Sequence, residues 1–296
     1  MGSNILEALD EALGDDIAKR VGVYGSRARL LHLRSGRVLP CRAIEALAEE
    51  GAGEKIFFHC AFVMRERVSE MGVEAYCAAN ARLRSLVVEA LGACTLRGLF
   101  VPSSGAVYKK GTHVLDDDRA TNPYGVSKRE DERVFADLAG SAPLCLPRVF
   151  NLSGPSINRI ESYALASMIE AVLADRPISI RAAHRVVRSY IHIRDLVALG
   201  LSMLLRPQKD DVASFDTAGD DVLELADLAE RVRAELGAPD LPILRPPFAK
   251  GELDDVYVGE GVVFARLMRA HGLRLRPMAE QIRDTADYLA GLRAAL

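Results

Sequence analysis

The sequence predicts an α/β protein in which a doubly wound parallel sheet is followed by a smaller C-terminal lobe. In the first half of the chain, short β-branched or aromatic runs alternate with helical patterns. This order is typical of a parallel sheet with helices on both faces. After Asn151 the alternation becomes less regular. We therefore expect a first domain over residues 1–155 and a second mainly over 156–296, with residues around 186–216 returning to the first.

Composition indicates a globular protein with a sizeable core. The chain has 296 residues, 49% of them hydrophobic, and a net charge of -3, which argues against a general nucleic-acid binder. No apolar run is long enough to cross a membrane, and the first helix lacks a basic signal-peptide start. The five cysteines form no Cys-x-x-Cys pair, and the six histidines show no metal-ligand spacing. We expect a cytoplasmic protein with free thiols and no metal site.

The first half of the chain divides into alternating elements. It opens with an amphipathic helix that Ser3 or Asn4 can cap, with Glu7 in the capping-box position, and that Gly14 can end. Strands are then predicted over residues 19–26, 29–40, 55–62, 96–105 and 142–151, and helices over 41–51, 73–94 and 122–140.

The second half is mixed. Helices are predicted over residues 161–176, 262–273 and 278–296, and residues 212–236 predict a strand, a turn and a helix. The proline-rich run over residues 238–251 is typical of a surface segment.

Tyr124 and Lys128 form a Tyr-x-x-x-Lys pair, and residues four apart share one face of a helix. An ammonium beside a phenol lowers the phenol's pKa from about 10, so such a tyrosine can exchange a proton with a substrate hydroxyl. The spacing alone is common in surface helices. However, Ser104 and Asn151 follow two predicted strands, and ligands bind at the carboxyl ends of strands in such sheets.

These motifs resemble the extended short-chain dehydrogenase/reductase superfamily, in its nucleotide-sugar epimerase/dehydratase branch. The similar stretches follow in the family's order: "FFHCAF", "AANARLRSLVVEA", "SSGAVY", "NPYGVSK", "RVFNLSGP", "RSYIHIRDLV" and "FDTAGDDVLELADLAERV". The resemblance implies a Rossmann-like first domain that binds NAD or NADP, a C-terminal substrate-binding lobe and a nucleotide-diphosphate sugar as ligand. It also implies a homodimer in which the helix around residues 74–93 pairs with the Tyr–Lys helix across a two-fold axis.

The resemblance also implies roles for single residues. Tyr124 would be the general acid/base, Lys128 would tune it and hold the nicotinamide ribose, and Ser104 would hydrogen-bond the reacting oxygen. The other implied cofactor contacts are Gly2, Ser26, Arg27, Ala61, Asn80 and Pro147, and the other implied substrate contacts are Gly105, Asn151 and Arg188.

Structural roles compete with some of these functions. Asn80 could equally be a capping or packing residue, and Arg188 could be a plain surface charge. His59 and His192 lie in strand patterns and are expected to be packed, not catalytic. Asp195 follows a strand and is expected to cap the next helix.

Two departures from the family pattern bear on function. Family dehydratases carry Asp-Glu after the catalytic hydroxyl residue, whereas this chain has Gly105 and Ala106, which argues against a 4,6-dehydratase. A 4-epimerase and a 4-keto reductase both remain open. After the Val-Tyr of the serine motif, the family's glycine is replaced by Lys109.

The larger departure lies at the start of the chain. The family begins with a strand and a Gly-x-x-Gly-x-x-Gly loop that receives the cofactor pyrophosphate. Here "GSNILEAL" matches only the last glycine and the helix, so the central strand and two glycines are missing. Reading "RVGVYGSRA" as that first strand leaves too few residues before "FFHCAF". As the second strand it ends in Ser26 and Arg27, which slightly favours NADP.

Loss of the central strand would leave two strands without a hydrogen-bonding partner. Three explanations are open: an internal start site, another segment that fills the gap, or a member that no longer binds nucleotide. We expect an NAD(P)-dependent epimerase or 4-keto reductase. The alternative is a non-catalytic relative that binds a nucleotide-sugar or a protein partner.

Overall fold

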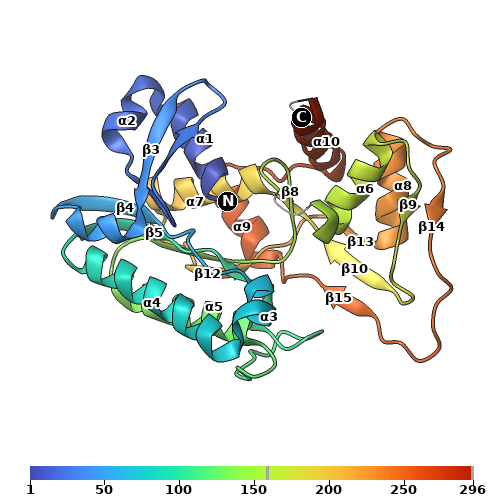
Figure 1. The fold of residues 1–296 in the computed structure, drawn as a ribbon, viewed down its shortest axis with the longest axis horizontal. Coiled ribbons are helices and arrows are strands. Elements are labelled where there is room, and N and C mark those ends of the chain that lie inside the picture. The colour runs from blue at the N-terminus through green and yellow to red at the C-terminus, as the bar shows by residue number, and fades with distance from the viewer. Residues whose placement is uncertain (158–159, 295–296) are drawn as a thin grey trace. The chain divides into compact units, whose positions relative to one another are not determined.

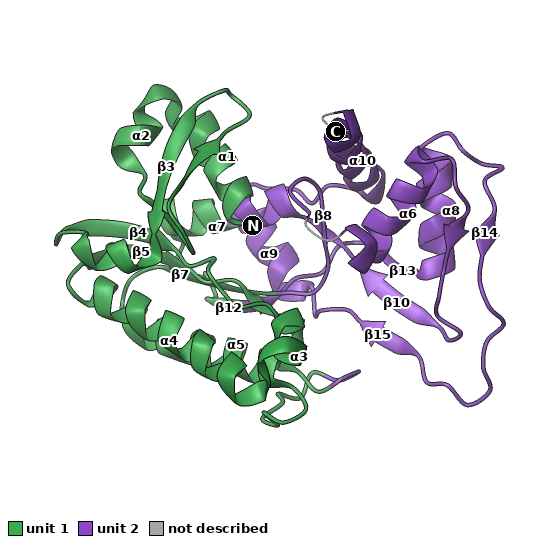
Figure 2. Ribbon diagram, viewed as in Figure 1, with its two compact units in different colours: residues 1–109, 113–148, 200–214 green, residues 110–112, 149–199, 215–296 purple. Residues whose placement is uncertain are grey.

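The α/β class is confirmed by the computed structural model, which describes residues 1–157 and 160–294. The described chain forms two compact units, shown in different colours in Figure 2. Unit 1 comprises residues 1–109, 113–148 and 200–214, and unit 2 comprises residues 110–112, 149–199 and 215–296.

The sheet of unit 1 has the strand order β12-β7-β5-β4. These strands are β4 (Glu54–Phe58), β5 (Thr95–Phe100), β7 (Leu144–Val149) and β12 (Ser214–Asp216), and the short β6 (Ser103–Ser104) also pairs with β7. β5 is parallel to both β4 and β7. The chain passes into unit 2 at β12, since Ser214 is the last residue of unit 1.

Helices cover both faces of β5, as the doubly wound prediction requires. Leu99 and Val101 pack into a core with the helices α4 (Val73–Gly92) and α5 (Pro123–Ala139). Phe100 points to the other face, because side chains alternate along a strand. There a Cβ on Gly200 of α7 (Ile193–Leu205) would lie 2.6 Å from the Phe100 ring, so this glycine allows the close packing. Figure 1 shows α4 and α5 together on one side of β5 and α7 on the other.

The N-terminal region differs from the prediction in its details. The opening helix is α1 (Gly2–Leu13), its N-cap is Met1, and no side chain caps it. The Glu7 carboxylate instead accepts a hydrogen bond from the backbone N–H of Arg34. The predicted capping by Ser3 or Asn4 was therefore wrong. Gly14 does end the helix, with a φ of 54° that favours glycine.

Further differences follow along residues 14–51. The structure has η1 (Gly14–Asp16), α2 (Ile17–Arg20) and β1 (Val23–Gly25). The run predicted as one strand forms an antiparallel hairpin of β2 (Arg29–His32) and β3 (Val38–Ala43), which turns at Gly36 with a φ of 87°. The predicted helix over 41–51 is replaced by the end of β3 and the 3₁₀ helix η2 (Ile44–Glu49).

Two strands of unit 1 lie at sheet edges. The sequence predicts that two strands lack a hydrogen-bonding partner, because it has no match to the family's central strand. In the described chain, β1, β3 and β2 form a separate sheet in the order β1-β3-β2, and β4 is the last strand of the larger sheet. β1 and β4 therefore each lack a pairing partner on one side. The Glu50 carboxylate links the two regions, because it accepts hydrogen bonds from Tyr24 of β1 and Lys55 of β4.

Unit 2 is built from short strands and helices around its own core. One sheet has the order β13-β10-β15, and β8 pairs with β11 and β9 with β14 in two further pairs. Apolar side chains of α6, α8 and α10 form one core with side chains of β10 and β13. The elements are β8 (Leu152–Ser153), α6 (Ala164–Leu173), β9 (Ile178–Ser179), β10 (Val186–Ser189), β11 (Ile191–His192), β13 (Val222–Glu224), α8 (Leu225–Glu235), β14 (Ile243–Leu244), β15 (Asp255–Tyr257), α9 (Val262–Ala270) and α10 (Met278–Ala294).

The remaining short elements are η3 (Arg65–Arg67), α3 (Val68–Met71), η4 (Gly105–Val107) and η5 (Ile160–Ser162). The predicted last helix extends to residue 296, and its last two residues lie outside the described residues. Among the described residues, no helix has the length and apolarity needed to span a membrane.

The compact units do not coincide with the predicted domain limits. Unit 1 ends its second segment at residue 148, not 155, and the segment that returns to it is 200–214, not 186–216. Residues 186–189 stay in unit 2 because β10 pairs there with β13 and β15.

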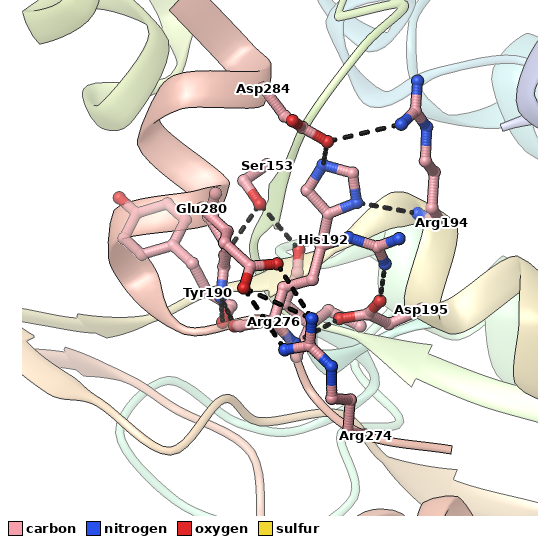
Figure 3. Close-up of polar contacts among 11 residues, drawn as sticks. Ser153, Tyr190, His192, Arg194, Asp195, Arg274, Arg276, Glu280 and Asp284 are labelled. Carbon is pink, nitrogen blue, oxygen red and sulfur yellow. Dashed lines mark hydrogen bonds and ion pairs between the residues drawn. The ribbon is translucent and has the colours of Figure 1, made fainter.

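His59 and His192 are packed residues, as predicted. His59 of unit 1 is 4% exposed and lies 4.5 Å from the Phe135 ring, measured between centroids. His192 of unit 2 is fully buried, its Nδ1 accepts a hydrogen bond from Arg194 N, and its Nε2 lies 3.4 Å from Asp284 Oδ2 (Figure 3). Burial lowers the pKa of His59 to about 3 and that of His192 to about 4.

Asp195 is not a helix cap. It lies in the first turn of α7, and its buried carboxylate accepts hydrogen bonds from the backbone N–H and the guanidinium of Arg276 (Figure 3). The prediction that Asp195 caps this helix was therefore wrong, and its side chain instead ties α7 to the segment before α10.

The two buried histidines predict that acid destabilises the protein. Below pH 6.5 the unfolded chain binds protons at both histidines, while the folded chain resists protonation down to about pH 4 at His192 and about pH 3 at His59. Their contribution to the free energy of unfolding is therefore complete above pH 6.5 and decreases as the pH falls. At pH 5 the loss is about 2 kcal/mol for each histidine.

Urea denaturation at pH 7 and pH 5 measures this effect. We expect His59→Gln to lose less stability on acidification than the wild type, and His32→Gln, at an exposed position of β2, to behave as the wild type. An equal loss in all three proteins would contradict the assignment.

Candidate functional site

The Tyr–Lys helix begins where the sequence predicts. Asn122 is the N-cap of α5, its side-chain oxygen accepts a hydrogen bond of 3.0 Å from Gly125 N, and Pro123 occupies the first turn. Both residue types favour a helix start at these positions. Tyr124 and Lys128 therefore lie one turn apart on the same face of α5.

The start of α5 packs directly on the turn that carries Ser104. Asn122 Nδ2 donates a hydrogen bond of 2.7 Å to the carbonyl oxygen of Ala106 in η4. A Cβ at Gly125 would lie only 2.0 Å from that same oxygen, so the contact requires glycine. Ser104 caps η4, since its Oγ accepts a hydrogen bond from Ala106 N. The predicted residues Ser104, Gly105, Tyr124 and Lys128 thus come from two elements in direct contact.

Lys128 is an almost fully buried cation. Its side chain is 7% exposed, and Nζ donates a hydrogen bond of 3.0 Å to the carbonyl oxygen of Pro102, between β5 and β6. Burial lowers the pKa of Lys128 to about 8, an effect that the nearby Asp131 carboxylate partly offsets.

Phe62, in the segment after β4, contacts both members of the pair. Its ring centroid lies 3.7 Å from Lys128 Nζ and 5.6 Å from the centroid of the Tyr124 ring, which it meets edge to face. Phe62 is not among the predicted site residues. The signal for it is the last residue of "FFHCAF", where the family's His-Leu-Ala-Ala pattern has a small residue.

A polar network supports the serine turn and was also missed. Glu132 of α5 forms a bidentate ion pair with Arg148 of β7, at 2.9 Å and 2.7 Å, and accepts a hydrogen bond from Ser103 Oγ. Arg148 also donates to the Tyr108 hydroxyl at 2.6 Å. The network connects both ends of the turn, Ser103 and Tyr108, to α5 and β7. The only sequence signal was the position of Glu132 four residues after Lys128.

Three predicted cofactor residues lie near the segment after β4 or in the core. An ideal Cβ at Gly2 would lie 3.8 Å from Cys60 Cβ, so α1 begins beside this segment. Ala61 is half-buried and packs against the core of unit 1, and Pro147 is buried on β7.

Asn80 is a packing residue, which was the alternative to its predicted contact with the cofactor. Its Oδ1 accepts a hydrogen bond from Val63 N, and its Nδ2 donates to the carbonyl oxygens of Val63 and Tyr76. A contact of Asn80 with the cofactor stays a prediction. Ser26 and Arg27 follow β1 and are exposed.

The other predicted substrate residues belong to unit 2. Asn151 Nδ2 donates to the carbonyl oxygens of Ser189 and Tyr257. Arg188 of β10 forms an ion pair of 2.9 Å with Asp255 and is not a plain surface charge. Their contacts with substrate stay predictions.

The close contact at Gly125 generates a test. We expect Gly125→Ala to destabilise unit 1 by roughly 3 kcal/mol or more, because the added Cβ must push α5 away from a backbone carbonyl. Gly92→Ala is the matched control, since a Cβ there meets no atom within 4 Å and alanine favours the helix. Urea denaturation of both variants measures the difference. Equal stability of the two variants would contradict the close contact.

Known proteins share this fold. In the solved UDP-glucose 4-epimerase of Thermotoga maritima with UDP-glucose, 96% of that chain aligns with 99% of this one, at 18% identity and a TM-score of 0.71. In the UDP-glucose 4-epimerase of Thermus thermophilus in complex with NAD, 96% of that chain aligns with 98% of this one, at 20% identity and a TM-score of 0.68. At these identities the likeness establishes the fold.

Sequence comparison identifies the family. A UDP-glucose 4-epimerase of Mycoplasma genitalium is 30% identical over 119 residues, which cover 33% of this chain and 35% of that protein. The chain therefore matches only about a third of the length of this curated relative. The family model for the NAD dependent epimerase/dehydratase family matches residues 1–215. Together these comparisons do not favour the alternative of a non-catalytic relative. The chain belongs to the NAD dependent epimerase/dehydratase family.

Proposed function

We propose that the protein is a nucleotide-sugar 4-epimerase in which Tyr124 is the general acid/base. The observation that carries this proposal is the direct packing of the Tyr124–Lys128 helix on the Ser104 turn, with a buried cation one turn from the phenol. A 4-keto reductase would need the same three residues. The absence of Asp-Glu after Ser104 supports either activity over a 4,6-dehydratase.

The donors of Lys128 that no acceptor among the described residues uses fit a nicotinamide ribose. An ammonium group has three N–H donors, and within the described part of the chain Lys128 Nζ has one hydrogen-bond acceptor, Pro102 O. Two donors can therefore meet the hydroxyls of a bound ribose. A nicotinamide ring, when bound, supplies the acceptor and donor of hydride. The epimerase from Thermus thermophilus was solved with NAD, which supports this class of cofactor.

Each of the other chemical roles in this proposal belongs to a side chain of unit 1. Tyr124 holds or releases a proton at its phenol oxygen, and the Lys128 cation stabilises the phenolate. In this proposal Ser104 Oγ hydrogen-bonds the reacting sugar oxygen. Glu132 and Arg148 act through Ser103 and Tyr108 to hold the turn in place, so they are positioning residues.

The proposed substrate is a uridine diphosphate hexose. The solved epimerase from Thermotoga maritima contains UDP-glucose, which supports this class of ligand. Asn151 and Arg188 are the proposed phosphate contacts, since a guanidinium group suits phosphate oxygens. For Arg188, such a contact adds to or replaces its ion pair with Asp255. A homodimer through α4 and α5 and a cytoplasmic location are part of the same proposal.

Substitution of the proposed acid/base tests the function. We expect Tyr124→Phe to lower the rate of UDP-glucose and UDP-galactose interconversion roughly 10²- to 10⁴-fold, because it removes the proton-carrying oxygen. Dinucleotide binding should persist, since the ring remains. Proton NMR of the sugar anomers measures turnover, and absorbance at the reduced-nicotinamide band distinguishes an epimerase from a reductase that consumes its cofactor. Undiminished turnover in the variant would refute the role.

Arg27 supports a preference for NADP within this proposal. Its side chain is exposed after β1, and within the described chain its guanidinium has no hydrogen bond or ion pair. We expect Arg27→Leu to reduce the affinity for NADPH about tenfold relative to NADH, because a charged partner of the 2′-phosphate is lost. Arg29→Leu, at an exposed position of β2, is the matched control. Fluorescence titration gives both affinities, and an unchanged ratio in Arg27→Leu would exclude this role.

A further inference from the structure

We propose that Phe62 is a removable cover on Lys128, which a bound ribose must displace and which thereby sets the affinity for the cofactor. The proposal rests on the proposed function, because it assigns the ligand of Lys128. It begins from one contact: the Phe62 ring lies on the Lys128 ammonium at 3.7 Å and meets the Tyr124 ring at its edge.

The contact closes the free side of the ammonium. Lys128 Nζ is buried and donates one hydrogen bond, to Pro102 O. The aromatic face stabilises the cation through its negative quadrupole, but it supplies no oxygen acceptor for the other donors. While the ring is in place, a hydroxyl oxygen cannot approach the ammonium from that side. The same ring is shared with Tyr124, so its departure uncovers both members of the pair.

The backbone beside Phe62 is held in place, so the side chain is the part that can move. Buried Asn80 binds the next residue twice: Oδ1 accepts from Val63 N at 2.8 Å, and Nδ2 donates to Val63 O at 3.3 Å. Phe62 itself is only half-buried. Rotation about its side-chain torsions can therefore expose Lys128 without opening the segment.

The cover has a consequence for affinity. A cation–π contact contributes about 0.5–2 kcal/mol, and a bound ribose must replace it. A chain without the ring should therefore bind the dinucleotide roughly 2- to 30-fold more tightly.

The first experiment measures binding. Phe62→Ala removes the cover, and Met64→Ala is the matched control, because Met64 lies in the same segment and is exposed. Fluorescence titration with NADH and NADPH should show tighter binding to Phe62→Ala and wild-type affinity in Met64→Ala. Unchanged or weaker binding to Phe62→Ala would overturn the proposal, since the ring would then be neutral or part of the cofactor site.

A second measurement needs no cofactor. The rate at which trinitrobenzenesulfonate modifies Lys128, followed by peptide mass spectrometry, reports the accessibility of the ammonium. We expect faster modification in Phe62→Ala than in the wild type and Met64→Ala, and an equal rate would refute the cover. If no variant binds either dinucleotide, the proposed function fails while this rate still decides whether Phe62 shields Lys128.

Phe62→Leu provides a second test in case the alanine variant misfolds. It keeps an apolar side chain on the segment but removes the aromatic face. We expect tighter dinucleotide binding than in the wild type here too, with a circular dichroism spectrum unchanged from the wild type. Wild-type affinity in a folded Phe62→Leu protein would show that the cation–π contact does not oppose binding.

Discussion

The proposed site depends on one close approach, between the start of α5 and the carbonyl oxygen of Ala106. Only a residue without Cβ can occupy position 125, because that atom would overlap the oxygen at 2.0 Å. Asn122 uses the same carbonyl as a hydrogen-bond acceptor while capping the helix. The cap and the glycine together dock the helix on the serine turn. The positions of Ser104, Tyr124 and Lys128 relative to one another follow from this docking.

Burial then gives the docked residues their chemical properties. Lys128 loses most of its water, and this burial lowers its pKa to about 8. Among the described residues, its ammonium keeps the carbonyl oxygen of Pro102 as a hydrogen-bond acceptor and the Phe62 ring as an aromatic contact. Glu132 and Arg148 both lie near the turn, and two parallel hydrogen bonds between the carboxylate and the guanidinium pair their charges. A buried ion pair of this kind adds little net stability, but it fixes geometry, because breaking it leaves a charge unpaired. We infer that the role of this ion pair is to fix the position of the serine turn.

Much of the fold was predictable where local signals and packing agree. The strands β4, β5 and β7 and the helices α4 and α5 follow apolar runs of the right period and lie close to the predicted ranges. The edge positions of β1 and β4 agree with the expectation that two strands lack a hydrogen-bonding partner. Predictions failed where the partner of a side chain lies far away in the sequence. Glu7 binds Arg34 N instead of closing a capping box, and Asp195 binds Arg276, because partners distant in the chain competed with local caps.

The sequence by itself determined the family, the helix that carries Tyr124 and Lys128, and the turn that carries Ser104, because short motifs set helix starts and side-chain periodicity. Only the tertiary structure decided what surrounds these residues. Phe62 reaches Lys128 across 66 positions of the sequence, and Arg188 pairs with Asp255 across 67. Such contacts depend on how separate elements pack, and no local spacing specifies them. The proposed function therefore rests on motifs, whereas the proposed cover of Lys128 by Phe62 rests on packing.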